Sequence, residues 1–353
     1  MRDSFWVGVS IIMVSLVLIL IMAATWHNSN AAKDELEFVT FAPGSIGQLY
    51  RDEWRVRPAK ISGRLHLPPG DGPFPAVVLM HGSFDPKDLA PWFNELVPAL
   101  VEANIAAFVV DSFSGRGLSS TAEYPARLSR AARLVDAFRA LSTLVPVDEI
   151  DERRIGITGY ASGGTAALLA AHRQVIAARL AGGRSFIAHL PVYPSCQPRF
   201  RSLALSYMPM LLLTGGQDEY EPAEYCMDYV EQAASAGYDV RIKVYPEAQH
   251  AWINNYKMTY CQECVTFKEC GPMYIEDSGH EFALDGRVST KFGWGEYIEE
   301  VYRDCGTREM NLGINQEART DTLTTTVNFF KENLKEAPVD PELENREWEH
   351  YTY

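Results

Sequence analysis

Three stretches of the sequence contain residue types that could carry out nucleophilic acyl transfer. Asp218 lies in LLLTGGQDEYEP, His250 lies in VRIKVYPEAQHAW, and residues 156–164 read GITGYASGG. This chemistry needs a nucleophile, a histidine base, a carboxylate that orients the histidine, and N–H donors for the oxyanion. Asp218 follows a buried apolar run and His250 follows the next expected strand, so both are expected at the same edge of a sheet. We therefore expect Asp218 to be the acid and His250 to be the base.

The glycine-rich stretch indicates which residue stands at the nucleophile position. A sharp turn between a strand and a helix needs small residues two positions before and two positions after the nucleophile. If the turn is centred on Ala161, these positions are Gly159 and Gly163. If it is centred on Ser162, one of them is Tyr160, which is too large. The spacing therefore predicts Ala161 at the nucleophile position, and a methyl group cannot attack a carbonyl carbon.

The elements that must position these residues are typical of a mostly parallel sheet with helices on both faces. Short β-rich runs alternate with helical patterns, and the continuous apolar run 76–80 predicts a buried parallel strand. Residues 61–67 alternate with period two and predict an edge strand. The other expected strands are 106–110, 155–158, 210–214, 240–245 and one ending near Tyr193, and the expected helices are 90–103, 129–144, 320–334 and those beginning near residues 163 and 222.

The beginning of the chain predicts a membrane segment. Residues 5–26 contain no charged side chain and are long enough to cross a bilayer, whereas an A-x-A-like site at residues 29–31 leaves a cleaved signal open. Arg2 lies in the four residues before the segment, which favours a cytoplasmic N-terminus (1–4). The main domain is then expected in the periplasm or outside the cell, and it would be secreted if residues 1–31 were cleaved.

The remaining boundaries follow from composition. We expect a linker over residues 27–35, one domain over 36–336, and a disordered acidic tail over 337–353. A formal net charge of −14, without a cluster of Lys and Arg, argues against a nucleic-acid partner. Residues 251–315 have little periodicity, and such a long connection is usually functional. We interpret them as an insertion that forms a lid or rim next to His250.

The cysteine count favours disulfides in an exported chain. The six residues form an even set that allows fifteen pairings. Cys196 and Cys226 follow neighbouring strands, so a disulfide between them is geometrically reasonable. A zinc site that includes His280 is the alternative, but the sequence has no second C-x-x-C and we expect no metal or cofactor. The candidate disulfide cysteines are Cys196, Cys226, Cys261, Cys264, Cys270 and Cys305.

These pieces together resemble the dienelactone hydrolase family of α/β-hydrolases. The matching stretches are VVLMHGS (77–83), VVDSFSGRG (109–117), GYASGG (159–164), GGQDEYEP (215–222) and VYPEAQHAW (244–252). The resemblance implies the α/β-hydrolase fold and the hydrolysis of carboxylic esters or lactones. It also implies that Asp218 and His250 are catalytic.

The same resemblance assigns the oxyanion donors and shows one departure. The N–H groups of Ser83, in the His81-Gly82-Ser83 loop, and of Ser162 would stabilise the oxyanion. The family's nucleophile, a cysteine or a serine, falls on Ala161. Three explanations stay open: a replaced nucleophile in an otherwise working site, a non-catalytic descendant that binds a ligand, and Ser162 as a displaced nucleophile.

The sequence offers few further substrate-binding candidates. Arg116 and Arg199 could each bind a substrate carboxylate, with a structural ion pair as the alternative for both. Tyr160 could line the pocket or pack in the core. A peptidase of the same fold remains a further possible activity. The expected partners are a small ester or lactone and, through residues 5–26, a membrane.

Overall fold

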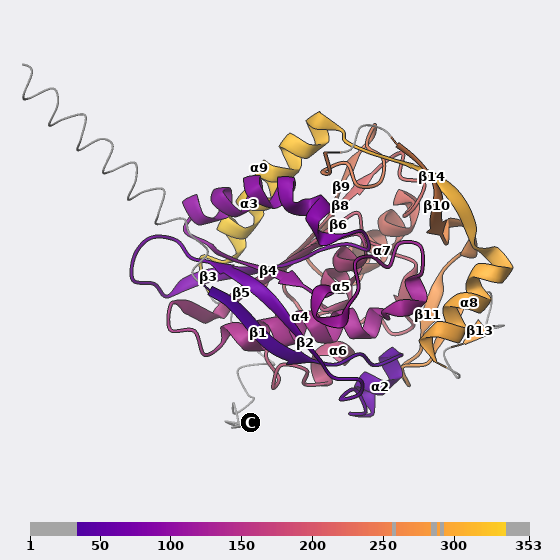
Figure 1. The fold of residues 1–353 in the computed structure, drawn as a ribbon, viewed down its shortest axis with the longest axis horizontal. Helices are drawn as coiled ribbons and strands as arrows, with labels where there is room; N and C mark the ends of the chain where they lie inside the picture. Colours follow the sequence, from indigo (N-terminus) through magenta and orange to yellow (C-terminus); the bar gives the residue numbers. More distant parts are fainter. Residues whose placement is uncertain (1–33, 256–258, 284–287, 290–292, 337–353) are drawn as a thin grey trace, which may run out of the picture.

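An eight-stranded sheet forms the centre of the computed structural model, which describes residues 34–255, 259–283, 288–289 and 293–336 (Figure 1). Its strands lie in the order β1-β2-β4-β3-β5-β6-β8-β9. β2 pairs antiparallel with both β1 and β4, and every later pair is parallel. The strand bounds are β1 Asp34–Thr40, β2 Ala59–His66, β3 Phe74–Met80, β4 Ala106–Asp111, β5 Ile150–Tyr160, β6 His189–Val192, β8 Met210–Gly215 and β9 Val240–Tyr245.

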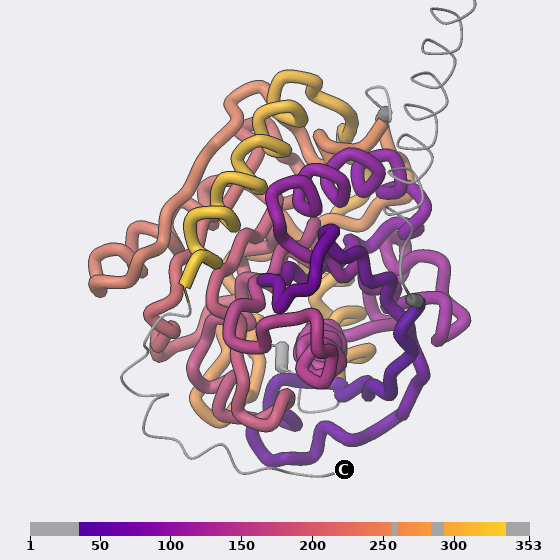
Figure 2. The backbone as a smooth tube through the Cα atoms, turned by 90° about the vertical axis from the view of Figure 1, so that its left-hand side faces the viewer, coloured from indigo at the N-terminus to yellow at the C-terminus, as the bar shows by residue number. Residues whose placement is uncertain are grey.

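Helices cover both faces of this sheet. α3 (Ala90–Glu102) and α9 (Gln316–Asn333) lie side by side on one face in Figures 1 and 2. On β3, Val77 and Leu79 pack with these two helices, whereas Val78 packs on the opposite face with α4. β3 is therefore buried on both faces, as its uninterrupted apolar run predicted. The helices on the opposite face include α4 Arg130–Leu144, α5 Ser162–Leu169, α6 Arg173–Ala177 and α7 Ala223–Ser235, and the short α2 Ile46–Tyr50 packs near α4 and α6.

The order of strands and helices confirms the sequence-based fold, with corrections at the first edge. Residues 61–67 were expected to form the edge strand, but β1 pairs outside β2 in a seven-residue register. The expected linker over 27–35 is also too long, because β1 begins at Asp34. The weak apolar pattern of the β1 sequence DELEFVT gave no strand signal, and pairing with β2 supplies its stability instead.

The region 251–315 contains more regular structure than its lack of periodicity suggested. β10 (Thr259–Thr266) pairs antiparallel with β14 (Thr307–Leu312). A second small sheet has the order β13-β12-β11-β7 and so joins this region to the main domain. The strands of this second sheet have only two or three residues each, too few for a periodic pattern, and the pairing of β10 is irregular between Cys261 and Val265. The remaining bounds are β7 Pro198–Phe200, β11 Met273–Ile275, β12 Glu281–Ala283, β13 Val288–Ser289 and α8 Trp294–Cys305.

All six cysteines form disulfides. The expected Cys196–Cys226 bond is present and lies in a buried cluster under α7. The other two bonds, Cys261–Cys264 and Cys270–Cys305, lie within the region 251–315. These bonds leave no cysteine thiolate for the alternative zinc site. Within the described ranges, no group of three or more His, Cys, Asp or Glu side chains could hold a metal ion.

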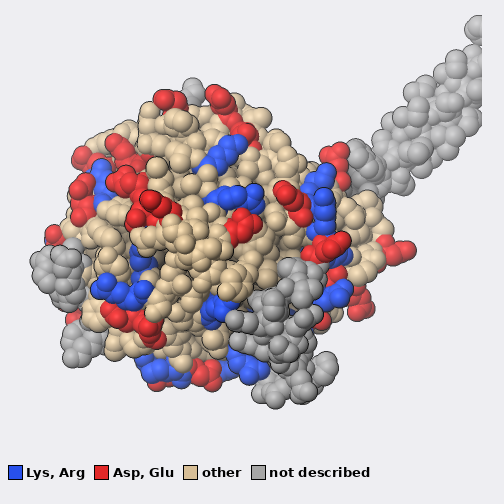
Figure 3. Space-filling view, turned by 180° about the vertical axis from the view of Figure 1, so that it is seen from behind, with Lys and Arg blue, Asp and Glu red and all other residues tan. Residues whose placement is uncertain are grey.

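The expectations for the two ends of the chain lie outside the described residues. Both the apolar segment 5–26 and the acidic tail 337–353 are in this position. No helix in the part of the chain that is described has the length and apolarity needed to span a bilayer. On the face in Figure 3, Lys and Arg are interspersed with Asp and Glu, so this face has no continuous basic surface for nucleic acid.

Candidate active site

Ala161 occupies a strained turn between β5 and α5. Its backbone angles are φ 49° and ψ −117°, which non-glycine residues seldom adopt and which persist where the surroundings enforce them. A Cβ added at Gly159 would lie 2.3 Å from the carbonyl oxygen of Gly163. A Cβ added at Gly163 would lie 2.4 Å from the carbonyl oxygens of Met80 and His81. Small residues are thus required on both sides of Ala161, in agreement with the frame read from the sequence.

His250 and Asp218 form a buried pair at the ends of neighbouring strands. The imidazole Nδ1 lies 2.8 Å from Asp218 Oδ2. Asp218 Oδ1 accepts the backbone N–H groups of Tyr220 and Glu221 at 2.9 and 2.8 Å. These bonds fix the carboxylate so that it orients the imidazole. His250 Nε2 is buried and has no protein hydrogen-bond partner among the described residues.

Two tyrosine rings pack against His250. The ring centroids of Tyr193 and Tyr220 lie 4.8 and 4.6 Å from that of the imidazole. Ala161 and His250 line the same small cavity of about 20 Å³, which we name the elbow cavity. Its lining residues are Gly82, Phe84, Asp85, Asp88, Leu89, Tyr160, Ala161, Tyr193, His250, Ala251 and Asn254.

A larger cavity of about 110 Å³, which we name the rim cavity, contains Ser162 in its lining and not His250. Ser83, Ser195 and Glu221 supply polar groups to the same wall. The Glu221 side chain is partly exposed, yet its surroundings are close enough that burial raises its pKa to about 8. This raised pKa favours the neutral form of the carboxyl group at pH 7. The region 251–315 contributes the apolar wall, formed by Phe267, Met273, Trp294 and Ile298.

The loop after β3 lies directly against the turn at Ala161. A Cβ added at Gly82 would stand 3.3 Å from the Cβ of Ala161 and 3.1 Å from the carbonyl oxygen of Tyr160. Ser83, the next residue, is buried and lines the rim cavity together with Ser162. The two residues expected to supply oxyanion N–H groups are thus brought together beside Ala161.

The structure does not favour Arg116 and Arg199 as substrate-binding residues. Arg116 binds Asp136 with two hydrogen bonds of 2.7 and 2.9 Å, and it lines neither cavity. Arg199 is paired with Asp228 and donates to the carbonyl oxygen of Tyr225 at 2.7 Å. The ion-pair alternative therefore describes both arginines, because their guanidinium groups are held by other parts of the protein.

Tyr160 fits both of its expected roles in part. Its ring is fully buried, and its hydroxyl accepts a 2.6 Å hydrogen bond from Trp92 Nε1. It also forms part of the wall of the elbow cavity. Sequence reasoning missed Tyr193 and Tyr220, which flank His250. Tyr220 could have been found because it follows Asp218 by two residues in the same loop, whereas nothing in the sequence relates Tyr193 to His250.

The strand order, the strained turn and the His250–Asp218 pair define the class of the protein as an α/β-hydrolase fold. A sequence profile of the dienelactone hydrolase family matches residues 61–267. This match covers more than half of the chain, and the chain belongs to that family.

Curated relatives agree with the family. A provisionally assigned carboxymethylenebutenolidase of Yersinia pestis is 34% identical over 119 residues, which are 32% of this chain and 42% of the relative. The alignment thus spans less than half of that relative's length. A provisionally assigned carboxymethylenebutenolidase of Aquifex aeolicus (strain VF5) is 22% identical over 217 residues, which are 59% of this chain and 88% of the relative.

Solved structures of related proteins are more distant in sequence. A provisionally assigned dienelactone hydrolase from Klebsiella pneumoniae subsp. pneumoniae MGH 78578 is 16% identical, with a TM-score of 0.47 over 84% of this chain and 99% of that chain. A dienelactone hydrolase-like promiscuous phosphotriesterase from metagenomic libraries is 15% identical, with a TM-score of 0.49 over 84% of this chain and 98% of that chain.

Proposed function

We propose that this site is built to hydrolyse carboxylic esters or lactones and that Ala161 takes the place of its nucleophile. The observation that carries the proposal is the elbow cavity, where the strained turn at Ala161 and the His250–Asp218 pair meet. A strained backbone that the fold maintains around a methyl group has no use in packing alone, but it is what a nucleophile on this turn requires.

His250 supports the proposal through its unused nitrogen. Asp218 binds Nδ1, which leaves Nε2 as the atom that would accept the proton of a nucleophile. A serine or cysteine at position 161 would supply that proton and form the acyl intermediate, which water would then hydrolyse. With alanine at 161 the covalent step lacks its attacking atom, so we expect the chain as it stands to turn over esters weakly or not at all.

The substrate class follows from the family and from the two cavities. The relatives are named for a butenolide, which is a lactone. We propose that the reacting carbonyl lies in the elbow cavity and that the rest of the ligand extends into the rim cavity. The apolar wall from the region 251–315 suits an apolar part of the ligand, and the same lining contains the cations of Arg130 and Arg133.

Ester hydrolysis by three forms of the full chain tests the proposal. We would compare the chain as given with Ala161→Ser and with Ala161→Ser combined with His250→Ala, using a small activated ester. Loss of a nucleophile in such sites costs on the order of 10³-fold or more in kcat. We therefore expect Ala161→Ser to gain a rate of that order and to lose it with His250→Ala. A native rate that disappears with Ser162→Ala would show instead that Ser162 is the nucleophile.

A non-catalytic ligand-binding role is the second candidate, and the methyl group at 161 is the observation that favours it. The cavities could hold an ester or lactone without cleaving it. If Ala161→Ser stays inactive although the chain binds a lactone in calorimetry, this role replaces the first.

We also propose that the domain functions outside the cytoplasm, attached to a membrane through residues 5–26. Three disulfides support an oxidising compartment, since such bonds are rare in the cytosol. Fractionation of expressing cells, with and without residues 1–31, tests this placement. Recovery of the full chain in the soluble cytoplasmic fraction would contradict it.

A further inference from the structure

A buried arginine on α4 binds the loop that follows β3. Arg133 is 2% exposed, its Nη2 donates to the carbonyl oxygen of His81, and its Nη1 lies 3.5 Å from His81 Nε2. No ion pair between Arg133 and a carboxylate is found in the described ranges. Burying a cation without such a partner is costly. Asp136 and Asp111 stabilise this charge without a direct ion pair, and the direct hydrogen bond of Arg133 is to His81, the first residue of the loop.

His81 is neutral, and the identity of its protonated nitrogen follows from its partners. The backbone N–H of Ser112 donates to Nε2 at 3.1 Å, so Nε2 is an acceptor. The proton must then be on Nδ1, which donates to the carbonyl oxygen of Gly82 at 2.8 Å. Burial and the adjacent Arg133 cation lower the pKa of His81 to about 3. The pattern is thus preserved at all physiological pH values.

These bonds determine which way the peptide groups of the loop face. In a trans peptide the C=O of one residue and the N–H of the next point in opposite directions. The carbonyl of His81 points to Arg133, so the N–H of Gly82 points away from it. The carbonyl of Gly82 points to the ring of His81, so the N–H of Ser83 points away from that ring. Both N–H groups therefore point away from α4. Gly82, which carries one of them, lies against Ala161.

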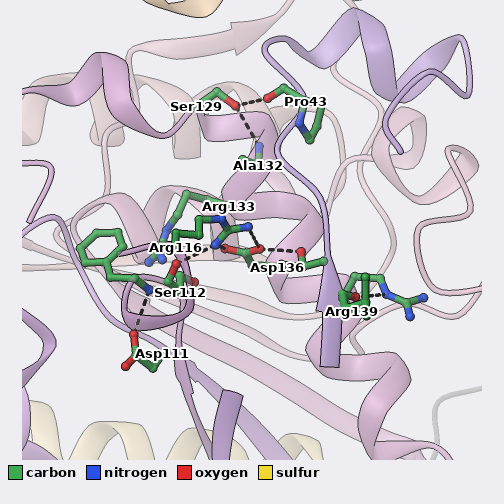
Figure 4. Close-up of polar contacts among 12 residues, drawn as sticks. Pro43, Asp111, Ser112, Arg116, Ser129, Ala132, Arg133, Asp136 and Arg139 are labelled. Carbon is green, nitrogen blue, oxygen red and sulfur yellow. Dashed lines mark hydrogen bonds and ion pairs between the residues drawn. The ribbon is translucent and has the colours of Figure 1, made fainter. Parts of the chain in front are cut away.

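A second layer of contacts keeps this arrangement rigid (Figure 4). Arg116 binds Asp136 of α4 and donates to the carbonyl oxygen of Ser112 at 2.6 Å. Thr40 of β1 donates to Asp136 at 2.6 Å. The Ser112 segment that fixes the ring of His81 is thereby tied to the same helix that carries Arg133.

We propose that Arg133 is a positioning residue that orients the N–H groups of the His81-Gly82-Ser83 loop toward the developing oxyanion. The inference rests on the proposed function, because the oxyanion forms only if the site cleaves an ester. Arg133 also lines the rim cavity, but its direct hydrogen bond is to His81 and it touches no reacting atom. It acts through His81, so its removal should weaken the binding of the transition state more than the binding of the ester.

Kinetics in the Ala161→Ser background tests this role. Loss of one oxyanion donor typically lowers kcat by about 10²- to 10³-fold. We expect Arg133→Gln to lower kcat by about 10²-fold with KM changed less than about threefold, and Arg133→Lys to recover part of the loss. Arg139→Gln is the matched control, because Arg139 lies on the same helix and contacts the carbonyl oxygen of Val39 instead. A raised KM with unchanged kcat, or an equal loss in Arg139→Gln, would overturn the proposal.

A second measurement separates this inference from folding defects and from the proposed function. In the full chain with Ala161 retained and histidine labelled with ¹⁵N, Arg133→Gln should raise the pKa of His81 by about one unit or more, because the adjacent cation is lost. Arg139→Gln should leave it unchanged. An unchanged His81 in Arg133→Gln refutes the coupling. If Ala161→Ser is inactive, the proposed function fails and the oxyanion role fails with it, even when the coupling to His81 is observed.

Discussion

The three disulfides should stabilise the fold by amounts that follow the loops they close. Their cysteines are separated by 30 residues in Cys196–Cys226, 35 in Cys270–Cys305 and 3 in Cys261–Cys264. Counting both cysteines of each loop, the chain-entropy relation then gives about 3.7, 3.8 and 1.9 kcal/mol for the three bonds. Removal of the short-loop bond should thus cost about half as much as removal of either long-loop bond.

Burial separates the two long-loop bonds. Cys196 and Cys226 are each 1% exposed and pack with Leu168, Leu212 and Tyr229. Replacing both by alanine removes buried sulfur atoms as well as the cross-link, which adds on the order of 1 kcal/mol for each side chain. In the Cys270–Cys305 bond, Cys270 is also buried (4% exposed) but Cys305 is only half-buried, so this bond should cost the loop value plus on the order of 1 kcal/mol for one buried side chain.

Urea unfolding of three double alanine variants, followed by tryptophan fluorescence without reductant, measures this order. The expected loss of stability is greatest for Cys196→Ala/Cys226→Ala, intermediate for Cys270→Ala/Cys305→Ala and smallest for Cys261→Ala/Cys264→Ala. The dependence of the unfolding free energy on urea concentration should be compared first. Only when this slope is equal among the variants does a shift in the urea midpoint report a change in stability. An equal or larger loss for the short-loop pair would refute the reasoning.

Two further predictions concern the turn and the rim cavity. Gly163→Ala should destabilise the chain by more than about 2 kcal/mol, because its Cβ would meet two carbonyl oxygens at 2.4 Å, whereas Gly295→Ala, with open space around it, should change the melting temperature little. The pKa of Glu221 is raised by burial to about 8, so the stability that its protonated form provides is complete below pH 4.5 and is lost as the pH rises toward 8. Glu221→Gln should therefore reduce the fall in unfolding free energy between pH 5 and pH 8.5 by on the order of 1 kcal/mol, measured by urea titration at each pH. A steeper fall in the variant would contradict the assignment.

The sequence predicted the parts of the fold whose signals are local. The apolar runs of β3 and β8 are long enough to identify buried strands. The alternating sequence VRIKVY identifies β9, which the structure has at the expected residues 240–245. β1 was missed because its seven residues have little apolar content. Its stability comes from pairing with β2, whose residues are distant in the sequence. The two- and three-residue strands next to α8 were missed because they are too short to produce a periodic pattern.

The residues of the candidate site could likewise be predicted only where their signal is local in the sequence. Gly159 and Gly163 gave the frame of the turn because the steric requirement is local in sequence. Asp218 and His250 could be paired because each follows a strand of one parallel sheet. Arg133 could not have been assigned, since it lies in the middle of a helical pattern and its contact with His81 spans 52 residues. Arg116 lies in a matching stretch, and its pairing with Asp136 is the structural ion pair that the sequence analysis left open, although the sequence could not identify the partner.

The central claim is that position 161 is the nucleophile position of a site that is otherwise intact. Covalent labelling with an alkyl fluorophosphonate, located by peptide mass spectrometry, tests it most directly. We expect the chain as given to remain unlabelled, Ala161→Ser to be labelled at residue 161, and His250→Ala in that background to abolish the label. Labelling of the chain as given at Ser162, or no label on Ala161→Ser while its fold is retained, would contradict the claim.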